Sequence, residues 1–215
     1  MMNKTLQVAL DLFSTEDALR ILDEVGEYVD IIEIGTPLIV AEGARVVSTV
    51  KKRYSNKTVF ADIKVMDGGA EVPKSVLEAG ADMFSVLAAA EDSTLKAAAR
   101  IAGEYRAKVL VDMCSVKDIS GRGKEIEKLN PDYICVHVGY DIQGTGVDPI
   151  SELRKLDGVA CKKAIAGGIK LDRFREAVSS PADDIICGAG IYRQPDMRET
   201  ARKMRAILDE YNRAH

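Results

Sequence analysis

Eight short apolar segments recur along the chain, and each ends in a polar residue or a glycine. They span residues 6–11, 30–35, 58–65, 83–89, 108–113, 133–139, 162–168 and 184–190. The stretches between them show the periodicity and the end signals of amphipathic helices. Because the eight segments are apolar on both faces, we predict that they are parallel strands covered on each side by other elements.

These segments follow one another at a regular interval. Asp11, Glu33 and Asp62, the polar ends of the first three, are 22 and 29 residues apart, which suits one strand, one helix and two short loops. Eight such units predict an α/β fold, a single (β/α)8 barrel formed by residues 1–215 as one domain. The alternative is an open doubly wound sheet, which usually carries a G-x-G-x-x-G turn after its first strand. Residues 11–14 read Asp-Leu-Phe-Ser instead, which favours the barrel.

Composition argues against several classes of protein. The net charge is −4, there is no Trp, and aromatic residues make up 5%, which speaks against a dedicated nucleic-acid binder. No apolar run approaches the ~20 residues of a membrane span, and the N-terminus lacks the apolar core of a signal peptide. Four dispersed cysteines and two histidines argue against structural zinc. We therefore expect a cytoplasmic protein with reduced thiols and with neither a nucleic-acid nor a membrane partner.

Two helix starts can be placed from local signals. Ser14 followed by Asp17 resembles a capping box. Thr36 precedes Pro37, a pair that predicts a cap residue before a proline at the first helical position.

Ionisable residues stand at or near the ends of five of the expected strands. They are Asp11, Glu33, Asp62 with Lys64, Asp112 and His137. Catalytic residues of such barrels lie at the carboxyl ends of the strands. One buried charge there could be a structural ion pair, but burying several unpaired charges costs several kcal/mol each. We therefore predict an active site at this end of the barrel.

The segment 61–69 carries the most specific pattern. Side chains alternate along a strand, so Asp62 and Lys64 should point together into the barrel. Asp67 follows in a loop that Gly68 and Gly69 free from steric constraint. Neighbouring carboxylates should keep Lys64 charged. An ordinary ion pair beside a turn is the alternative reading, but two charges within one strand favour a catalytic role.

Glu33 and His137 complete the candidate chemistry. Glu33 lies on the strand before Asp62, and adjacent strands are about 4.8 Å apart. Two carboxylates so close would share a proton or bind a cation, and oxygen ligands suit Mg²⁺ or Mn²⁺. His137 is the only internal histidine, and we predict that it is a general acid–base, with a core histidine as the alternative.

The last two expected strands end in glycine clusters, residues 166–168 and 188–190. Barrel enzymes often bind phosphate in the loops after strands 7 and 8. Small residues there let backbone N–H groups approach the anion, although tight turns alone would also explain them. The implied ligand is a phosphorylated small molecule.

With these motifs the chain resembles the 3-hexulose-6-phosphate synthases, within the orotidine 5′-monophosphate decarboxylase suprafamily. The likeness covers nearly the whole chain. It rests on residues 9–11, 33–37, 61–69, 111–113, 136–141 and 166–169. The Asp-x-Lys-x-x-Asp array that begins at Asp62 marks the suprafamily, and the elements around Asp112 and His137 are more specific to the synthases.

The resemblance implies an aldol condensation of formaldehyde with D-ribulose 5-phosphate, in the ribulose monophosphate pathway. The product is D-arabino-hex-3-ulose 6-phosphate, and the reaction passes through a Mg²⁺-stabilised ene-diolate. By this likeness Glu33 and Asp62 serve the metal, His137 moves protons, and Lys64 holds developing negative charge. Asp67 reaches into the partner's site of a homodimer. The resemblance also assigns substrate binding to Asp11, Asp112, Asp141, Gly167, Gly168, Gly188, Ala189 and Gly190.

Several alternatives share the scaffold. The 3-keto-L-gulonate-6-phosphate decarboxylases carry arginines where this chain has Tyr140 and Gly190, and they tend to have Glu in place of Asp112. Orotidine-phosphate decarboxylases use no metal, which fits Glu33 poorly. Ribulose-phosphate epimerases need two metal-binding histidines, and this chain has one internal histidine. A phosphosugar-binding barrel without catalysis is the non-enzyme alternative, against which the intact set of acid, base and lysine argues.

Overall fold

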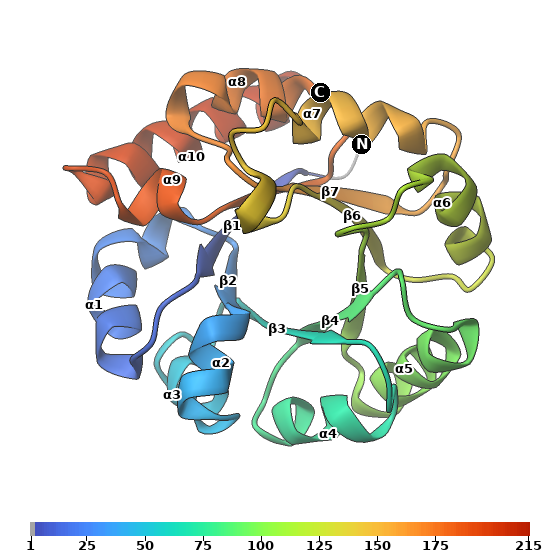
Figure 1. The fold of residues 1–215 in the computed structure, drawn as a ribbon. Coiled ribbons are helices and arrows are strands. Elements are labelled where there is room, and N and C mark those ends of the chain that lie inside the picture. The colour runs from blue at the N-terminus through green and yellow to red at the C-terminus, as the bar shows by residue number, and fades with distance from the viewer. Residues whose placement is uncertain (1–2) are drawn as a thin grey trace.

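The computed structural model describes residues 3–215 and contains a closed barrel of eight parallel strands in sequence order. The strands form the ring at the centre of Figure 1, and β1 pairs with both β2 and β8. They are β1 (Thr5–Leu10), β2 (Ile31–Ile34), β3 (Thr58–Val65), β4 (Met83–Leu87), β5 (Lys108–Asp112), β6 (Tyr133–His137), β7 (Lys162–Ala166) and β8 (Asp184–Cys187). All eight expected strands are present, so the (β/α)8 prediction is confirmed and the open sheet is excluded.

Helices surround the ring on its outside (Figure 1). They are α1 (Thr15–Val25), α2 (Thr36–Glu42), α3 (Arg45–Arg53), α4 (Glu71–Glu78), α5 (Asp92–Tyr105), α6 (Ile119–Glu127), α7 (Pro149–Leu153), α8 (Leu171–Ser179), α9 (Ala189–Tyr192) and α10 (Met197–Ala214), with short 3-10 turns η1 (Gly26–Tyr28), η2 (Tyr140–Ile142) and η3 (Arg154–Leu156). Fully buried residues such as Leu10, Ile32 and Phe84 belong to the main apolar core that joins strands and helices. None of the helices within residues 3–215 has the length and hydrophobicity that crossing a membrane requires.

The inside of the barrel is filled by every second residue of each strand. Ile31, Phe60, Met83, Leu110 and Tyr133 belong to one buried cluster separate from the outer core. Side chains two positions further along a strand point the same way, nearer the carboxyl end. Glu33, Asp62, Ser85 and Asp112 stand two residues after the first four of these, and all four are buried. The strand period therefore gathers the polar groups at one end of the barrel.

The local helix signals are only partly right. Ser14 caps α1 and accepts a hydrogen bond from the Asp17 amide, as predicted. The prediction for Thr36 is wrong, because Gly35 is the cap residue of α2 and Thr36 is already helical. The Thr36 hydroxyl is directed at Asp62 instead, at 2.9 Å from its Oδ2.

The chain just before β1 and the end of α10 are hydrogen-bonded to each other. Lys4 N donates to Asn212 Oδ1 at 2.9 Å, and Asn212 Nδ2 donates to the Lys4 carbonyl at 3.0 Å. Because β1 also pairs with β8, the first and last barrel units are joined by backbone and side-chain bonds alike.

Candidate active site

A bulge in β3 shapes the centre of the site. Ala61 pairs with Phe84 and Val65 with Val86, so three residues of β3, at positions 62 to 64, face the single residue Ser85 of β4. Lys64 adopts a left-handed backbone conformation, with φ of +43°. Lys64 Nζ still forms an ion pair with Asp62 Oδ2, as alternation had suggested. The contact forms at the bulged part of the strand, where Lys64 departs from regular strand conformation.

Asp62 is the hub of the hydrogen-bond network. Its Oδ2 accepts from the Thr36 hydroxyl and from Lys64 Nζ, and its Oδ1 accepts from the Ser85 hydroxyl at 2.6 Å. The residue is 5% exposed. Donors from β3, β4 and α2 therefore fix the orientation of this carboxyl group before any ligand binds.

Asp112 links the lysine to the histidine. His137 Nδ1 lies 2.8 Å from Asp112 Oδ2, and Lys64 Nζ lies 3.9 Å from the same oxygen. The Cys114 amide donates to Asp112 Oδ1 at 2.8 Å. Asp112, which the resemblance assigns to substrate binding, is placed by the structure as the partner of His137.

The pKa shifts follow from this pairing. Burial alone would lower the pKa of Lys64, but the charges of Asp62 and Asp112 outweigh it and raise that pKa above its ordinary value. Burial would likewise lower the pKa of His137, and the bond to Asp112 raises it. The pKa of Asp112 is lowered despite its burial, because His137 and Lys64 favour the carboxylate. Asp112 therefore stabilises the charged forms of Lys64 and of His137, and each of them stabilises its carboxylate.

Glu33 and Asp11 add negative charge beside Asp62. Gln7 Nε2 donates to Glu33 Oε2 at 2.6 Å. Burial, together with the charges of Asp62 and Asp11, raises the pKa of Glu33 well above its usual range. The pKa of Asp11 is also raised, because the surrounding protein displaces part of its hydration and because Asp62 is negatively charged. A cation placed among these oxygens would relieve the repulsion.

The donor set fits a hard divalent cation only in a limited way. Within residues 3–215, no group of three or more His, Cys, Asp or Glu side chains is arranged to hold a metal. Mg²⁺ commonly uses one or two carboxylates and completes its shell with water and substrate oxygens. Glu33 and Asp62 supply two such carboxylates on adjacent strands, so a site completed by substrate is chemically consistent with them.

Two predicted residues lie outside the buried cluster. Asp67 is exposed just beyond β3, and its Oδ1 accepts from the amide of Gly68 at 2.7 Å. Asp141 is exposed on η2. The structure of one chain therefore gathers Glu33, Asp62, Lys64, Asp112 and His137. It places Asp11, which is exposed, close enough for its charge to act on Glu33, and leaves Asp67 and Asp141 at the surface.

The glycines after β7 and β8 allow close backbone packing. Gly167 and Gly168 have φ of +104° and +71°. A Cβ on Gly167 would collide with the Val138 carbonyl oxygen, and one on Gly190 would collide with the Ile169 carbonyl oxygen. Gly188 and Ala189 lie beside Gly190 where β8 runs into α9. These loops are thus packed against their neighbours, with backbone groups close to the mouth of the barrel.

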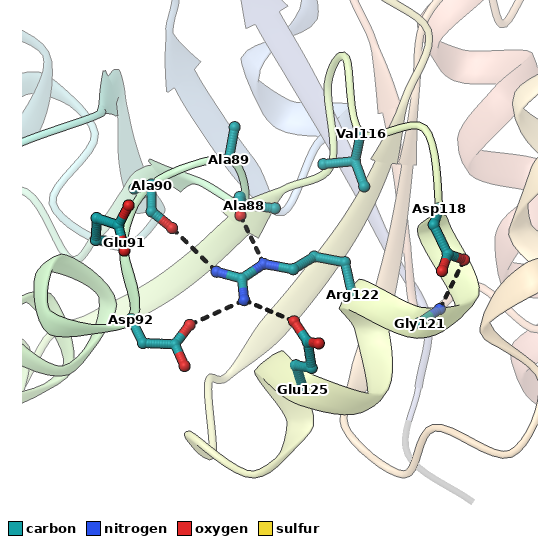
Figure 2. A pocket seen from close by; sticks show the side chains of 10 residues that line it. All are labelled: Ala88, Ala89, Ala90, Glu91, Asp92, Val116, Asp118, Gly121, Arg122 and Glu125. Atoms are coloured by element: carbon teal, nitrogen blue, oxygen red, sulfur yellow. Dashed lines mark hydrogen bonds and ion pairs between the residues drawn. The ribbon is translucent and has the colours of Figure 1, made fainter.

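A hollow of about 500 Å³ lies between the loop that precedes α5 and the start of α6 (Figure 2). Arg122 reaches across it, and Nε donates to the Ala88 carbonyl at 2.8 Å while Nη2 donates to the Ala90 carbonyl at 3.0 Å. Its Nη1 pairs with Asp92 and Glu125. The guanidinium is occupied in joining two loops, and the hollow contains none of the predicted site residues.

Sequence analysis missed three polar residues that hold the cluster. Gln7 and Ser85 are both fully buried within apolar strands, and Thr36 bonds Asp62. A polar residue inside an otherwise apolar strand was the available signal for the first two. The role of such a residue depends on which side chains it faces on the neighbouring strands. Those neighbours can be identified only when the register between the strands is known.

Comparison with known proteins shows the family of this chain. The model of the orotidine 5′-phosphate decarboxylase / HUMPS family matches residues 4–204. The 3-hexulose-6-phosphate synthase of Bacillus subtilis (strain 168) is 45% identical over 206 residues, which cover 94% of this chain and 98% of the relative.

Solved structures show the same relation. A 3-hexulose-6-phosphate synthase from Salmonella typhimurium superposes with a TM-score of 0.93 at 34% identity, covering 96% of this chain and 99% of the other. A 3-keto-L-gulonate-6-phosphate decarboxylase from Vibrio cholerae superposes with a TM-score of 0.86 at 28% identity, covering 98% and 99%. The chain therefore belongs to the orotidine 5′-phosphate decarboxylase / HUMPS family, among relatives named 3-hexulose-6-phosphate synthase.

Proposed function

We propose that this chain is a lyase, a 3-hexulose-6-phosphate synthase, which condenses formaldehyde with D-ribulose 5-phosphate to D-arabino-hex-3-ulose 6-phosphate. The observation that carries the proposal is the continuous chain of contacts from Asp62 through Lys64 and Asp112 to His137. These four residues hold the Lys64 ammonium beside His137 at the mouth of the barrel. The relatives at 39–45% identity that bear this name support the assignment.

His137 is the proton-transfer group of the proposal. Asp112 occupies its Nδ1, so Nε2 is the ring atom that exchanges a proton with substrate. It removes a proton from C1 of ribulose 5-phosphate, and C1 of the resulting ene-diolate forms a bond to the formaldehyde carbon. The same proton then passes to the oxygen that came from formaldehyde. Atoms and charge balance without any oxidant or reductant.

Lys64 stabilises the negative charge that develops on the substrate oxygens. It is held charged between Asp62 and Asp112, so no reorganisation is needed when that charge appears. A Schiff base would require the neutral amine, and the raised pKa of Lys64 disfavours it. Asp11 lies at the mouth, where it can accept hydrogen bonds from substrate hydroxyl groups.

Glu33 and Asp62 are the proposed ligands of Mg²⁺ or Mn²⁺. The crowding of negative charge that raises the pKa of Glu33 supports a cation at this place. When bound, the ion supplies Lewis-acid stabilisation of the ene-diolate. Gln7 holds Glu33 in position through its amide at 2.6 Å.

The phosphate group is proposed to bind at the glycine loops after β7 and β8. Gly167 and Gly168, both with positive φ, form a tight turn after β7, and successive backbone N–H groups in a turn can form an anion-binding concavity. Gly188, Ala189 and Gly190 offer further N–H groups where the next loop begins. The small side chains keep this path open for the phosphosugar.

A homodimer with shared sites is part of the proposal. Asp67 is exposed, and so are three apolar side chains on α2, after β3 and on α4: Val40 is 80% exposed, Met66 53% and Val72 46%. Met66 adjoins Asp67 in the chain, so a surface that buried Met66 would carry Asp67 into the contact. A second copy of this chain is the proposed partner.

The proposed location is the cytoplasm. The four free cysteines are consistent with a reducing compartment.

Decarboxylation of 3-keto-L-gulonate 6-phosphate is the second candidate, since a decarboxylase of that name shares the fold. Two assays of the purified protein separate the candidates, one with formaldehyde and ribulose 5-phosphate and the other with 3-keto-L-gulonate 6-phosphate. We expect turnover in the first that EDTA abolishes and Mg²⁺ restores. Borohydride added with substrate should leave no adduct on Lys64. Turnover only in the second assay would overturn the proposal, and a trapped adduct would overturn its mechanism.

A further inference from the structure

The polar groups of β3 and β4 meet at a place where backbone pairing is interrupted. Residues 62 to 64 of β3 occupy the space opposite Ser85 alone, and regular pairing resumes at Val65 with Val86. Lys64 accommodates the two extra residues by its φ of +43°, a conformation that side chains other than glycine rarely adopt. Such a conformation persists only where its surroundings hold it.

Ser85 provides that hold with a side chain. Its Oγ accepts a hydrogen bond from the Lys64 amide at 2.8 Å. A hydroxyl has a single proton, and the amide supplies the proton of that bond, so the Ser85 proton points to Asp62 Oδ1, at 2.6 Å. Ser85 is fully buried, so solvent does not compete for either bond. One hydroxyl therefore fixes the backbone of the lysine and the carboxyl group of its partner.

We propose that Ser85 is a positioning residue for the reaction: it holds Lys64 in its left-handed conformation and orients Asp62 toward the Lys64 ammonium. Ser85 acts through these two residues, because both of its hydrogen bonds are to protein atoms. Thr36 supports the opposite oxygen of Asp62. With Ser85 removed, Asp62 keeps Thr36 and Lys64, so the fold is retained while the ammonium group is free to shift.

The inference rests on the proposed function, and its first test is kinetic. We expect Ser85→Ala to lower kcat roughly 10- to 100-fold, the range for a catalytic group displaced by a fraction of an ångström to 1 Å. KM for ribulose 5-phosphate should stay within about threefold, because no bond to the phosphosugar is removed. Ser85→Thr keeps the hydroxyl and should restore most of kcat.

Ser180 provides a matched control. It is also buried, its Oγ donates to the Ala177 carbonyl at 2.6 Å, and it accepts from the Ala182 amide at 3.3 Å. It precedes β8, at the opposite end of the barrel from the site. Ser180→Ala removes a comparable buried hydroxyl and should leave kcat unchanged. An equal fall of kcat in both variants, or no fall in Ser85→Ala, would overturn the proposal.

A second measurement does not depend on activity. Hydrogen exchange followed by NMR should show faster exchange of the Lys64 amide in Ser85→Ala and no change there in Ser180→Ala. If the wild-type protein turns over no ribulose 5-phosphate, the proposed function fails, and the exchange rate still decides whether Ser85 holds Lys64. Unchanged exchange at Lys64 would overturn the inference. Should Ser85→Ala not fold, Ser85→Cys makes the same comparison, since a thiol is a weak donor and acceptor.

Discussion

At the carboxyl end of the barrel, Asp62, Lys64, Asp112 and His137 lie together in one network of ion pairs and hydrogen bonds, and Glu33, bonded to Gln7, lies on the adjacent strand. At the amino end, Asp184 is buried by itself on β8, with the Thr5 hydroxyl donating to its Oδ1 at 2.6 Å. Within residues 3–215 no hydrogen-bond partner reaches its Oδ2. Both ends bury carboxyl groups, but only the carboxyl end gives them positive partners.

The pKa values separate the two ends. Asp112 is buried beside His137 and Lys64, and its pKa is lowered. Burial raises the pKa of Asp184 to about 7, and the negative charges of Asp30 and Asp183 act in the same direction. At the carboxyl end, Asp112 and Lys64 are thus held in their charged forms by opposite charges. At the amino end, the buried Asp184 carboxyl group keeps its proton instead. It takes no part in the proposed reaction.

The largest expected effect breaks the network at the carboxyl end. His137→Asn should lower kcat by about 10²–10⁴-fold, the range for loss of a general acid–base group. The His137 side chain is partly exposed at the mouth of the barrel. The circular dichroism spectrum and the substrate binding of the variant protein should therefore be unchanged. Steady-state kinetics with formaldehyde and ribulose 5-phosphate provide the measurement. Near-normal kcat would make His137 an orienting residue only.

The next effect concerns stability at the amino end. Between about pH 4 and 7 the folded protein keeps the Asp184 proton that the unfolded chain has released, because the folded pKa is about 7 and the ordinary value is 3.8. This group therefore makes the folded state less stable as pH rises, by about 1.4 kcal/mol per pH unit. Below pH 4 the effect vanishes, and above pH 7 it is constant.

Asp184→Asn removes that titration while keeping an oxygen for Thr5. Urea unfolding of both proteins should show the variant gaining on the wild type from pH 4 to 7, by up to about 4 kcal/mol. The test is the slope of unfolding free energy against pH. The absolute difference is not, because the amide group introduced at position 184 would also lack a hydrogen-bond partner and would itself cost stability. Asp172→Asn, on exposed α8, should leave the slope unchanged. Parallel curves for wild type and Asp184→Asn would show that Asp184 is ionised in the folded protein.

The third prediction extends the network into a second subunit. Asp62→Ala and Asp67→Ala chains, each inactive, are mixed under conditions of subunit exchange. Random pairing makes about half the dimers mixed, and each of these has one intact site if Asp67 serves the partner. Roughly a quarter of wild-type activity should return. A mixture as inactive as its parents would show that Asp67 serves its own barrel.

The strands and the location of the site could be predicted from local sequence alone. Apolar segments mark buried parallel strands, and parallel strands bring their carboxyl ends to one side. Asp62, Lys64 and His137 were therefore expected at one mouth before any pairing was known. The helix start at Ser14 was right for the same reason, because its signal lies within three residues.

What could not be predicted depends on register between strands. Regular alternation does not reveal that Lys64 has φ of +43° or that three residues face Ser85. The partner of Asp112 lies 25 residues along the chain, on β6. Asp184 stands in the sequence as one more polar strand start. Its raised pKa comes from burial in the closed barrel and from the charges of Asp30 and Asp183, and the bond from Thr5 opposes the shift.

The smallest expected effect concerns the ion pairs beside the mouth. Arg122→Lys keeps a charge for Asp92 and Glu125 but cannot reach the carbonyls of Ala88 and Ala90 together, because an ammonium lacks the planar fork of a guanidinium. We expect a loss of about 1–2 kcal/mol in unfolding free energy, the range for a few hydrogen bonds from a charged group, and kcat unchanged. Arg100→Lys, in an exposed pair with Glu104, is the control and should lose less. The Ala88 amide donates to the Asp112 carbonyl at 2.8 Å, so a fall in kcat with Arg122→Lys would mean that this loop helps to position Asp112. In that case the active-site network would extend from the buried charges to the hollow in Figure 2.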